Sequence, residues 1–582
     1  MLKIIYILFA YLIAFNSNSN VIEKSQNSYF LTKVLSESDL KIYKNVILYQ
    51  KKYQWEKADR ALSKVENPIL VGHFQYEKLM HPNKYKASYK ELSNWFKINT
   101  DYPPVLRKRI YYLLIKRLPD KSKKNLYQKP LFENYLRGYG EDNHIRGYSL
   151  QSKNKYSKNI KNKVSNFMSE EKHDSVIDFI NSNVNDNANY LINTINEEIN
   201  KIFFKGDIHT SMKLFDMYVN SLNTPSPNIF FRAGINAYRL GSFKKAKNYF
   251  NECNKIVESN NKWLFTGCSY WESLLENSEK KKSKLLKKAS KFPRTLYGQL
   301  AIEQLNISDP FTWRNYPNQK EVNFSHLNEN KIFKRAIALT EVGLYNHADL
   351  EIRNLYSKTQ KDELNNLFYA SEKLDLPAVL IRLGSKYYKK DLTLFMRGLY
   401  PTPDWQINDG YKIDKALLFA VIRRESAFNF KAKSSKGARG LMQIMPRTAS
   451  KINNDYRLRY SKAYTLYSLQ LNIEIGQKLL NRLMNSPNAK NSILDTLIAY
   501  NAGTTRLKKW KKNIYNLEPI IFIESIPIKE TRWFVKYILT DLWIYRDKLQ
   551  QAKPSRALLA KGKWPKYKNL DYRIIHDAKF RR

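Results

Sequence analysis

Glycine and proline are scarce in this chain, and their scarcity restricts the fold more than any other feature of the sequence. Only 18 Gly and 20 Pro occur among 582 residues, so the chain lacks the frequent turns that β-sandwiches and β-barrels need. Between residues 25 and 395, apolar residues recur at intervals of three and four, which is the period of amphipathic helices. The sequence therefore predicts a mainly all-α protein, and its length predicts two or three domains.

A helical hairpin is predicted most clearly around residue 240. Small residues let two helices approach closely, and a glycine between them allows a tight turn. Both features occur together in Ala233, Ala237, Tyr238, Gly241, Ala246, Tyr249 and Phe250. The segment resembles a tetratricopeptide-type hairpin, the repeating unit of α-superhelical solenoids, although other αα-hairpin bundles have similar spacing.

The chain is strongly basic, with 100 Lys and Arg against 53 Asp and Glu and a net charge of +47. Such a charge favours an anionic partner: nucleic acid, an acidic membrane face or a polymer that carries carboxylates. A proteome-wide drift toward Lys, Asn and Ile explains it equally well, because the lysines are spread along the whole chain. The lysine-rich stretch 280–291 includes Leu285, Leu286 and Ala289 at helical spacing, which indicates the solvated face of an amphipathic helix. We recognise no module that reads nucleic acid, and we predict no nucleic-acid partner.

The N-terminus predicts export. Met1–Lys3 is a short basic start, an apolar run follows from Ile4 to Phe15, and an Asn/Ser stretch comes next. This pattern resembles a secretory signal, and the apolar run is short for a membrane span. No Ala-x-Ala cleavage site follows, so residues 1–20 are either a signal peptide or a retained N-terminal anchor. We therefore expect a periplasmic protein.

Only two cysteines occur in the chain, Cys253 and Cys268. That number excludes a disulfide-stapled scaffold and a four-cysteine metal site. Because free cysteines are commonly buried, the sequence favours a buried structural role for both over a disulfide between them.

A turn-rich segment divides the chain near residue 400. It contains Tyr400-Pro401-Thr402-Pro403-Asp404 and then Asn408-Asp409-Gly410, a composition typical of linkers. We predict a helical domain over residues 21–400 and a second domain over 401–560. A basic tail over 561–582 is expected to pack on the surface or to move in part.

Glu425 is the residue that most clearly suggests chemistry. Asp414 can cap a helix that begins at Lys415, and on that helix Leu418, Ile422 and Glu425 share one face. A carboxyl group at the end of an apolar stripe loses hydration, which raises its pKa above the ~4.3 of free Glu. A raised pKa suits a general acid that works at neutral pH.

Two arginines adjoin this carboxyl group. Arg423 and Arg424 would lower its pKa if they pointed toward it, but their positions on the helix direct them elsewhere. Taken alone, a Glu at such a position is more often a surface or capping residue than a catalyst. The assignment of Glu425 therefore depends on the residues further along the chain.

Three motifs follow Glu425. In the first, Gly437 and Gly440 allow a tight backbone path near a ligand, and Pro446 suits the first turn of a helix. In the second, Gly503 ends a helix that is predicted from Ser492. The motifs are Ser434 to Pro446, Ala499-Tyr500-Asn501-Ala502-Gly503, and Glu524-Ser525-Ile526-Pro527 with Glu530 to Val535.

Together with Arg424-Glu425-Ser426-Ala427-Phe428, these motifs closely resemble the catalytic domain of bacterial soluble lytic transglycosylases, relatives of goose-type lysozyme. The resemblance covers about residues 400–550, and the segment 292–301 resembles part of the helical superhelix of that family. It implies an N-terminal α-superhelical solenoid followed by a lysozyme-like, mostly helical catalytic domain. It also implies a reaction that needs no metal and no cofactor.

The resemblance implies a role for each matched residue. Glu425 matches the single catalytic acid/base. Asn501 serves equally well as a structural residue at a helix end. Phe534 replaces a common Tyr of the family and Thr504-Thr505 replaces a turn with Pro or Gly, and both changes affect the groove rather than the acid. The positions that match the sugar-binding groove are Ser434, Gln443, Met445, Tyr500, Asn501 and Glu530.

The reaction that the resemblance implies is cleavage of the β-1,4 bond between N-acetylmuramic acid and N-acetylglucosamine, with formation of 1,6-anhydromuramyl ends. The partner is then the glycan strand of peptidoglycan, whose peptide stems carry carboxylates that suit a basic chain. Two alternatives stay open: a hydrolytic lysozyme-type muramidase, and a non-catalytic wall-binding scaffold. Peripheral association with the membrane or with wall-synthesis machinery is compatible with the sequence, which does not indicate an oligomeric state.

Overall fold

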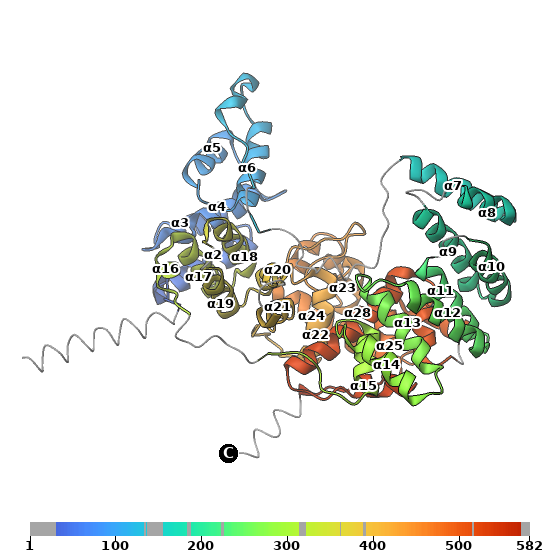
Figure 1. Cartoon of the computed structure of the whole chain (residues 1–582). Helices are drawn as coiled ribbons and strands as arrows, with labels where there is room; N and C mark the ends of the chain where they lie inside the picture. The colour runs from blue at the N-terminus through green and yellow to red at the C-terminus, as the bar shows by residue number, and fades with distance from the viewer. Residues whose placement is uncertain are drawn as a thin grey trace, which may run out of the picture. The chain divides into compact units, whose positions relative to one another are not determined.

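The computed structural model describes residues 31–132, 135–136, 155–182, 188–222, 226–313, 322–360, 363–387, 392–514 and 517–571 (Figure 1). The predicted signal or anchor over residues 1–20 and the predicted tail beyond residue 571 lie outside these ranges. Within them the secondary structure is helical, and the β-structure consists of isolated bridges, which confirms the mainly all-α prediction. None of the helices in these ranges combines the length and the apolar composition that a membrane span requires.

The chain forms two compact units, and each combines segments that are far apart in the sequence. The described residues of the first unit lie within 1–141, 312–406 and 427–431. Its helices are α2 (Glu37–Lys51), α3 (Trp55–Leu62), η1 (Pro68–Leu70), α4 (Val71–Leu79), α5 (Tyr89–Ile98), α6 (Pro104–Lys116), η2 (Lys121–Leu126), α16 (Ser325–Glu329), α17 (Lys331–Glu341), α18 (Tyr345–Leu355), η5 (Tyr356–Lys358), α19 (Leu364–Lys373), α20 (Pro377–Tyr387) and α21 (Leu392–Leu399).

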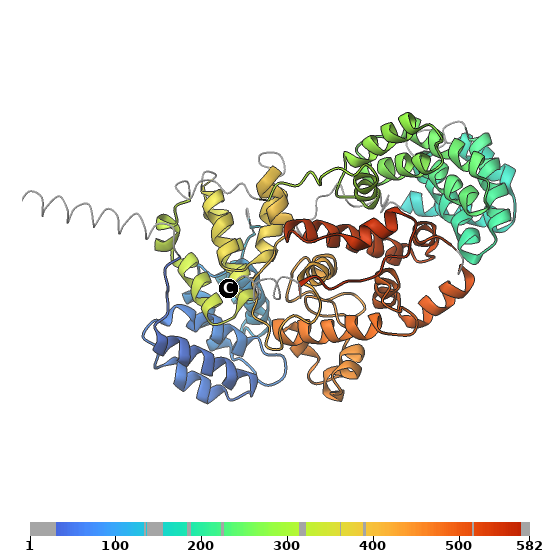
Figure 2. The same ribbon diagram turned by 90° about the horizontal axis from the view of Figure 1, so that it is seen from below.

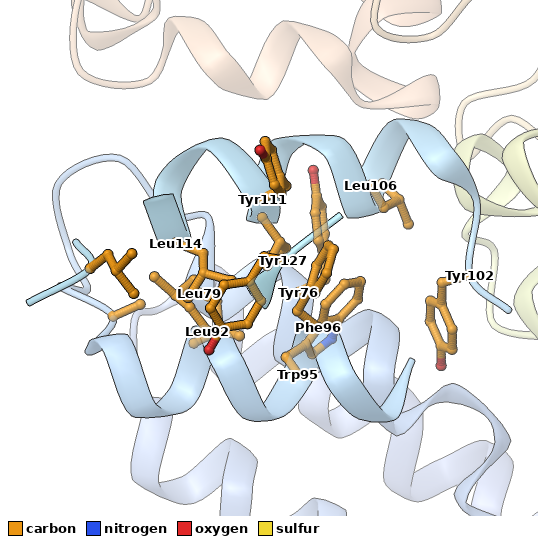
Figure 3. Close-up of a cluster of buried hydrophobic side chains, with 13 residues drawn as sticks. Tyr76, Leu79, Leu92, Trp95, Phe96, Tyr102, Leu106, Tyr111, Leu114 and Tyr127 are labelled. Carbon is orange, nitrogen blue, oxygen red and sulfur yellow. The ribbon is translucent and has the colours of Figure 1, made fainter. Parts of the chain in front are cut away.

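An aromatic cluster forms one core of the first unit, where α4, α5 and α6 meet (Figure 3). Trp95 of α5 is buried in this cluster, and its indole Nε1 donates to Gly72 O over 2.8 Å. A Cβ at Gly72 would collide with the side chains of Asn99 and Tyr102, so glycine permits this close approach. Burial of large aromatic rings stabilises these three helices together.

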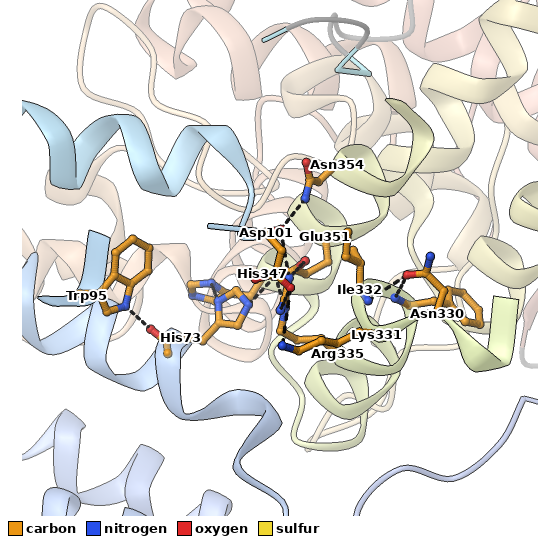
Figure 4. A network of polar contacts seen from close by, with 12 residues as sticks. His73, Trp95, Asp101, Asn330, Lys331, Ile332, Arg335, His347, Glu351 and Asn354 are labelled. Carbon is orange, nitrogen blue, oxygen red and sulfur yellow. Dashed lines mark hydrogen bonds and ion pairs between the residues drawn. The ribbon is translucent and has the colours of Figure 1, made fainter. Parts of the chain in front are cut away.

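A buried polar network joins the early and the later segments of the first unit (Figure 4). Arg335 of α17 donates to both carboxylate oxygens of Glu351 of α18, over 2.8 and 2.9 Å. His73 of α4 places Nε2 2.7 Å from Glu351 Oε1, and its Nδ1 lies 3.1 Å from Nδ1 of His347. Buried ionic groups need partners of this kind, so the network fixes α4 against α17 and α18.

The described residues of the second unit lie within 142–311, 407–426 and 432–582, and they are also seen from below in Figure 2. Its helices are α7 (Lys155–Ser169), α8 (His173–Asn181), α9 (Ala188–Lys205), α10 (Ile208–Ser221), α11 (Pro227–Arg239), α12 (Phe243–Ile256), α13 (Lys262–Leu274), α14 (Glu279–Ser290), α15 (Leu296–Gln304), α22 (Lys415–Ser426), α23 (Pro446–Ile452), η6 (Tyr456–Arg459), η7 (Ala463–Tyr467), α24 (Leu469–Met484), α25 (Ile493–Ala502), α26 (Thr504–Asn513), α27 (Pro519–Ser525), α28 (Lys529–Lys548) and α29 (Pro554–Ala560).

The predicted hairpin is confirmed in α11 and α12, where Gly241 makes the turn with a φ of 74°. Gly234 lies against Phe250, whose ring would be 2.6 Å from an added Cβ. Cys253 and Cys268 are fully buried and are joined by a disulfide, with their Cα atoms 5.9 Å apart. The preference for burial without a bridge was wrong, because the packing of α12 on α13 brings the two cysteines within bonding distance.

The helices before and after residue 400 meet within the second unit. Arg556 of α29 donates to Glu303 and Gln299 of α15 and to Asp309, each over 2.7 Å. The lysine-rich stretch forms α14, whose Leu286 is buried, as predicted for an amphipathic helix. The domain boundaries predicted from the sequence stay predictions.

Candidate active site

The helix that carries Glu425, α22, is fixed at its N-terminus by Asp414. The Asp414 carboxylate accepts from Leu417 N over 3.2 Å, which confirms the predicted cap. Arg546 of α28 donates to Asp414 Oδ2 over 3.0 Å, and Tyr567 donates to Asp414 Oδ1 over 3.2 Å. Since Tyr567 follows α29, the described part of the predicted tail packs against the start of α22.

Helix α22 is buried on all sides rather than along a single stripe. Every residue from Ala416 to Arg423 is buried, and α28 packs along this helix. Leu418 and Ile422 are fully buried, whereas Glu425 retains partial exposure. The carboxyl group of Glu425 therefore lies where a buried helix reaches the surface, accessible to a ligand but poorly hydrated.

The pKa of Glu425 is raised to about 8. Burial is the main cause, because it penalises the charged form, and the negative charge of Glu530 raises the pKa further. The rise predicted from the sequence is confirmed, and Glu530 is a second cause that sequence reasoning missed. At neutral pH the carboxyl group is mostly protonated, which is the state that a general acid needs.

The two arginines beside Glu425 are both bound to one buried carboxylate on α28. Arg423 Nη1 donates to Asp541 Oδ2 over 3.1 Å, and Arg424 donates from Nη2 to Asp541 Oδ1 over 3.0 Å and from Nε to Oδ2. The Arg424 guanidinium also lies 4.2 Å from the centre of the Tyr537 ring. Although burial raises the pKa of Asp541, the charges of Arg423 and Arg424 outweigh it, and the pKa is lowered. The arginines are thus engaged elsewhere, as predicted.

The loop between α22 and α23 contains three of the predicted groove residues. Ser434 Oγ accepts from Ala438 N over 3.0 Å, and Gln443 Nε2 donates to Gly440 O over 2.8 Å and to Ala432 O over 3.1 Å. The polar groups of both residues therefore hold the loop in shape. The third groove residue, Met445, directly precedes α23 and is 39% exposed.

Glycine is required at position 440 of this loop. Its φ is 78°, in the left-handed region that favours glycine. A Cβ there would also collide with Leu466 O and with the side chain of Asn472. The sequence motif therefore contains Gly440 because the loop passes directly against η7 and α24.

Tyr500 of α25 lies beside both this loop and Glu425. Its hydroxyl donates to Met442 O over 2.7 Å, and its ring stacks on Phe534 with centroids 6.2 Å apart and planes 5° apart. Burial, and then the charge of Glu425, raise the pKa of Tyr500 well above its ordinary value. The ring of Phe534 thus has a packing role, although it lacks the hydroxyl of the common family residue.

The remaining predicted residues lie at the junction of α25 and α28. Asn501 Oδ1 accepts from Thr531 Oγ1 over 2.6 Å, a contact that ties the two helices together. Glu530 is exposed in the first turn of α28. The structure thus brings Glu425, Tyr500 and Glu530 within electrostatic reach of one another, and it gives Asn501 a structural contact.

These features define an all-helical protein in which a lysozyme-like domain carries one protonated, poorly hydrated carboxyl group. The Transglycosylase SLT domain family matches residues 406–523. The membrane-bound lytic murein transglycosylase E of Buchnera aphidicola subsp. Baizongia pistaciae is 34% identical over 149 residues, which are 24% of this chain and 69% of that protein. The chain belongs to the family of lytic murein transglycosylases that carry this domain.

Two further similarities extend beyond this domain. The soluble lytic murein transglycosylase of Escherichia coli K12 is 28% identical over 286 residues, which are 48% of this chain. The chain spans 43% of the length of that relative. The crystal structure of the 70 kDa soluble lytic transglycosylase from Escherichia coli is 18% identical, with a TM-score of 0.54, over 91% of this chain and 99% of that one. At this identity the structural likeness shows a shared all-α fold.

Proposed function

We propose that this protein is a lytic transglycosylase that cleaves the β-1,4 bond between N-acetylmuramic acid and N-acetylglucosamine in peptidoglycan. The observation that carries the proposal is the pKa of about 8 at Glu425, which keeps a proton available at neutral pH. The names of the relatives, which are murein transglycosylases, support peptidoglycan as the substrate.

In the proposed reaction Glu425 acts first as an acid and then as a base. It donates its proton to the oxygen that links the two sugars, and the acetamido group of the substrate stabilises the cationic sugar, as in substrate-assisted glycosidases. The resulting carboxylate then takes the proton of the C6 hydroxyl, whose oxygen closes the 1,6-anhydro ring. A raised pKa serves both steps, because a poorly hydrated carboxylate repelled by Glu530 is also a stronger base. The internal hydroxyl is already near the reacting carbon, which replaces an encounter with water.

The groove residues are proposed to orient the sugar rather than to react. The proton of the Tyr500 hydroxyl is directed at Met442 O, so we assign Tyr500 as an acceptor for the acetamido N–H and as a support of the loop. Glu530 is exposed and close to Glu425, and we propose that it binds the polar substituents of the sugar ring. We propose that Ser434 and Gln443 maintain the shape of the groove, because their polar groups form hydrogen bonds within the loop. Met445, at the exposed end of the same loop, is assigned an apolar contact with the glycan.

The proposed place of action is the periplasm. Disulfides persist mainly in oxidising compartments, and the bond between Cys253 and Cys268 agrees with the signal-like N-terminus. A chain with a net charge of +47 also suits a wall polymer whose peptide stems carry carboxylates.

The test is incubation of the purified protein with cell-wall sacculi, followed by mass spectrometry of the released fragments. We expect anhydro ends, which are one water lighter than hydrolysed ends, and release by the Glu425→Gln variant that is at least about 100-fold slower. Hydrated ends alone would replace the proposal by the hydrolytic muramidase. Binding to sacculi without any release would favour the non-catalytic scaffold, and full activity of the variant would remove Glu425 from the mechanism.

A further inference from the structure

The part of the second unit that follows residue 407 exposes large hydrophobic side chains within one short segment. Over the described residues from 407 to 571, the exposed ones are Met445, Tyr456, Tyr460 and Tyr464, with exposed fractions of 39, 67, 57 and 47%. Single exposed hydrophobic residues are common on proteins, but these are concentrated in one short segment. The segment begins at Met445, which is one of the predicted groove residues.

Buried leucines of the same segment anchor it to the domain, and the tyrosines beside them stay exposed. Leu458 of η6 and Leu466 of η7 are buried, and they anchor the segment to the domain. Asp455 starts η6 by accepting from Arg457 N over 3.0 Å. The ring centroids of Tyr456 and Tyr460 are 5.2 Å apart, with the planes tilted by 53°. The segment therefore presents its aromatic rings on a fixed backbone.

A short series of hydrogen bonds connects this segment to the candidate active site. Asn472 of α24 donates to Leu466 O over 2.7 Å, and its Oδ1 accepts from Met442 N over 2.8 Å. Met442 O in turn accepts from the hydroxyl of Tyr500, which lies beside Glu425. Hydrogen bonds through the buried Asn472 thus connect the exposed segment with the loop of the site.

The same segment is rich in positive charge. Arg457 and Arg459 are exposed and Lys462 is half-buried, whereas Asp455 is the acidic residue between 445 and 468. Two of the cations already bind Asp455, Arg457 at 2.8 Å and Lys462 at 3.8 Å, and Arg459 lies 5.2 Å from the centre of the Tyr460 ring. An excess of positive charge therefore surrounds the exposed rings, and it suits an anionic partner.

We propose that Tyr456, Tyr460 and Tyr464, here called the tyrosine platform, bind the peptidoglycan strand whose cleaved bond lies at Glu425. Sugar rings stack on the tyrosines, and carboxylates of the peptide stems bind Arg457, Arg459 and Lys462. The proposal rests on the proposed function, because a continuous strand is what connects the platform with Glu425. Rigid aromatic rings beside cations fit a polymer that offers both ring faces and carboxylates.

The first test measures binding to insoluble sacculi in the Glu425→Gln background, in which cleavage does not remove the ligand. The double variant Y456A/Y460A should lower the affinity about tenfold, the effect of two lost aromatic contacts. The matched control is Tyr112→Ala, which removes a tyrosine of the first unit that is 52% exposed, and it should bind as the parent does. Equal binding by Y456A/Y460A and its parent would overturn the platform.

The second test distinguishes the contribution of the cations to binding from that of the tyrosine rings. The variant R457Q/R459Q should lose affinity for intact sacculi, and it should match its parent on sacculi from which an amidase has removed the stems. If the R457Q/R459Q variant lost binding to DNA or to anionic vesicles but still bound intact sacculi as its parent does, the wall polymer would be rejected as the partner. The proposed function fails separately, if the unmodified protein releases no fragments from sacculi that it binds.

Discussion

Two glutamates of the second unit differ in the groups around them, and their pKa values move in opposite directions. Glu524 of α27 is 1% exposed, and it binds Lys536, the hydroxyl of Tyr297 and, over 3.2 Å, Arg232 Nη1. Burial raises its pKa, but the charges of Lys536 and Arg232 outweigh burial and lower the pKa to about 2. Glu425 is also poorly hydrated, yet the charge that acts on it is that of Glu530, and its pKa is raised to about 8.

The difference shows that burial does not by itself make a carboxyl group reactive. A buried carboxylate with cationic partners stays ionised and joins helices, as Glu524 does between α27, α28 and α11. A carboxyl group without them keeps its proton, which is then available for transfer. At Glu425 the two nearest arginines in the sequence would supply cationic partners, but Asp541 binds both of them.

The largest expected effect is on the activity of the Glu425→Gln variant. Loss of the proton donor should lower the rate of fragment release by about 10²- to 10⁴-fold. Thermal unfolding should occur at no lower temperature, because glutamine removes a poorly hydrated acid that Glu530 repels. The control is Glu474→Gln on α24, which breaks a surface pair with Lys478 and should stay within twofold of the unmodified rate. A rate loss of similar size in both variants would show that the assay reports folding rather than chemistry.

The next largest effect is on the stability of the Glu524→Gln variant. Arg232 and Lys536 would stay buried without their anion, and breaking such a cluster lowers the free energy of unfolding by about 3–5 kcal/mol. Urea denaturation measures the change. Stability equal to that of the unmodified protein would mean that the cluster adds nothing to the joint between α11, α27 and α28.

Asp541→Asn tests whether the arginines beside Glu425 must be neutralised. We expect the free energy of unfolding to fall by about 3 kcal/mol, which is the lower end of the range for breaking a buried ion pair. The loss stays at the lower end because the Tyr537 ring still contacts Arg424. The freed positive charges should also lower the pKa of Glu425, and the decline of activity at alkaline pH should move to lower pH. Asp547→Asn, on the same helix, breaks a contact with Lys553 and should leave the pH profile in place. A profile unaltered in the Asp541 variant would contradict this role of Asp541.

Local features of the site could be predicted from the sequence. Asp414 caps the helix that begins at Lys415 by accepting from Leu417 N, three residues further on, and Gly503 ends α25 with a φ of 89°. The turn at Gly241 between α11 and α12 is equally local. Each of these signals depends on residues within one or two turns of a helix, which periodicity and capping rules describe.

The long-range partners could not be predicted in this way. Asp541 lies 117 positions from Arg424, and His73 lies 278 positions from Glu351. No repeat or spacing relates such residues, because they meet only after the helices have packed. For the same reason the sequence indicated one apolar stripe on α22, whereas in the folded domain, where α28 packs along it, this helix is buried from Ala416 to Arg423.

The smallest expected effect concerns pH, and it tests the comparison of the two glutamates directly. Activity should decline above about pH 8 as Glu425 loses its proton, and Glu530→Gln should move this decline to lower pH by removing the repelling charge. Because the folded-state pKa of Glu425 exceeds its ordinary value of 4.5, the folded protein holds an extra proton between about pH 4.5 and 8. The contribution of Glu425 to stability therefore falls as pH rises through that window.

Glu524 should show the opposite dependence of stability on pH. Its folded-state pKa of about 2 lies below its ordinary value of 4.5, so its stabilising contribution is present above about pH 4.5 and is lost as the pH falls toward 2. Denaturation of both Gln variants across pH 2 to 9 measures the two slopes. Relative to the unmodified protein, Glu425→Gln should gain stability as the pH rises from 4.5 to 8, and Glu524→Gln should lose it as the pH rises from 2 to 4.5. Slopes of the same sign would mean that the neighbouring charges do not distinguish the two carboxyl groups.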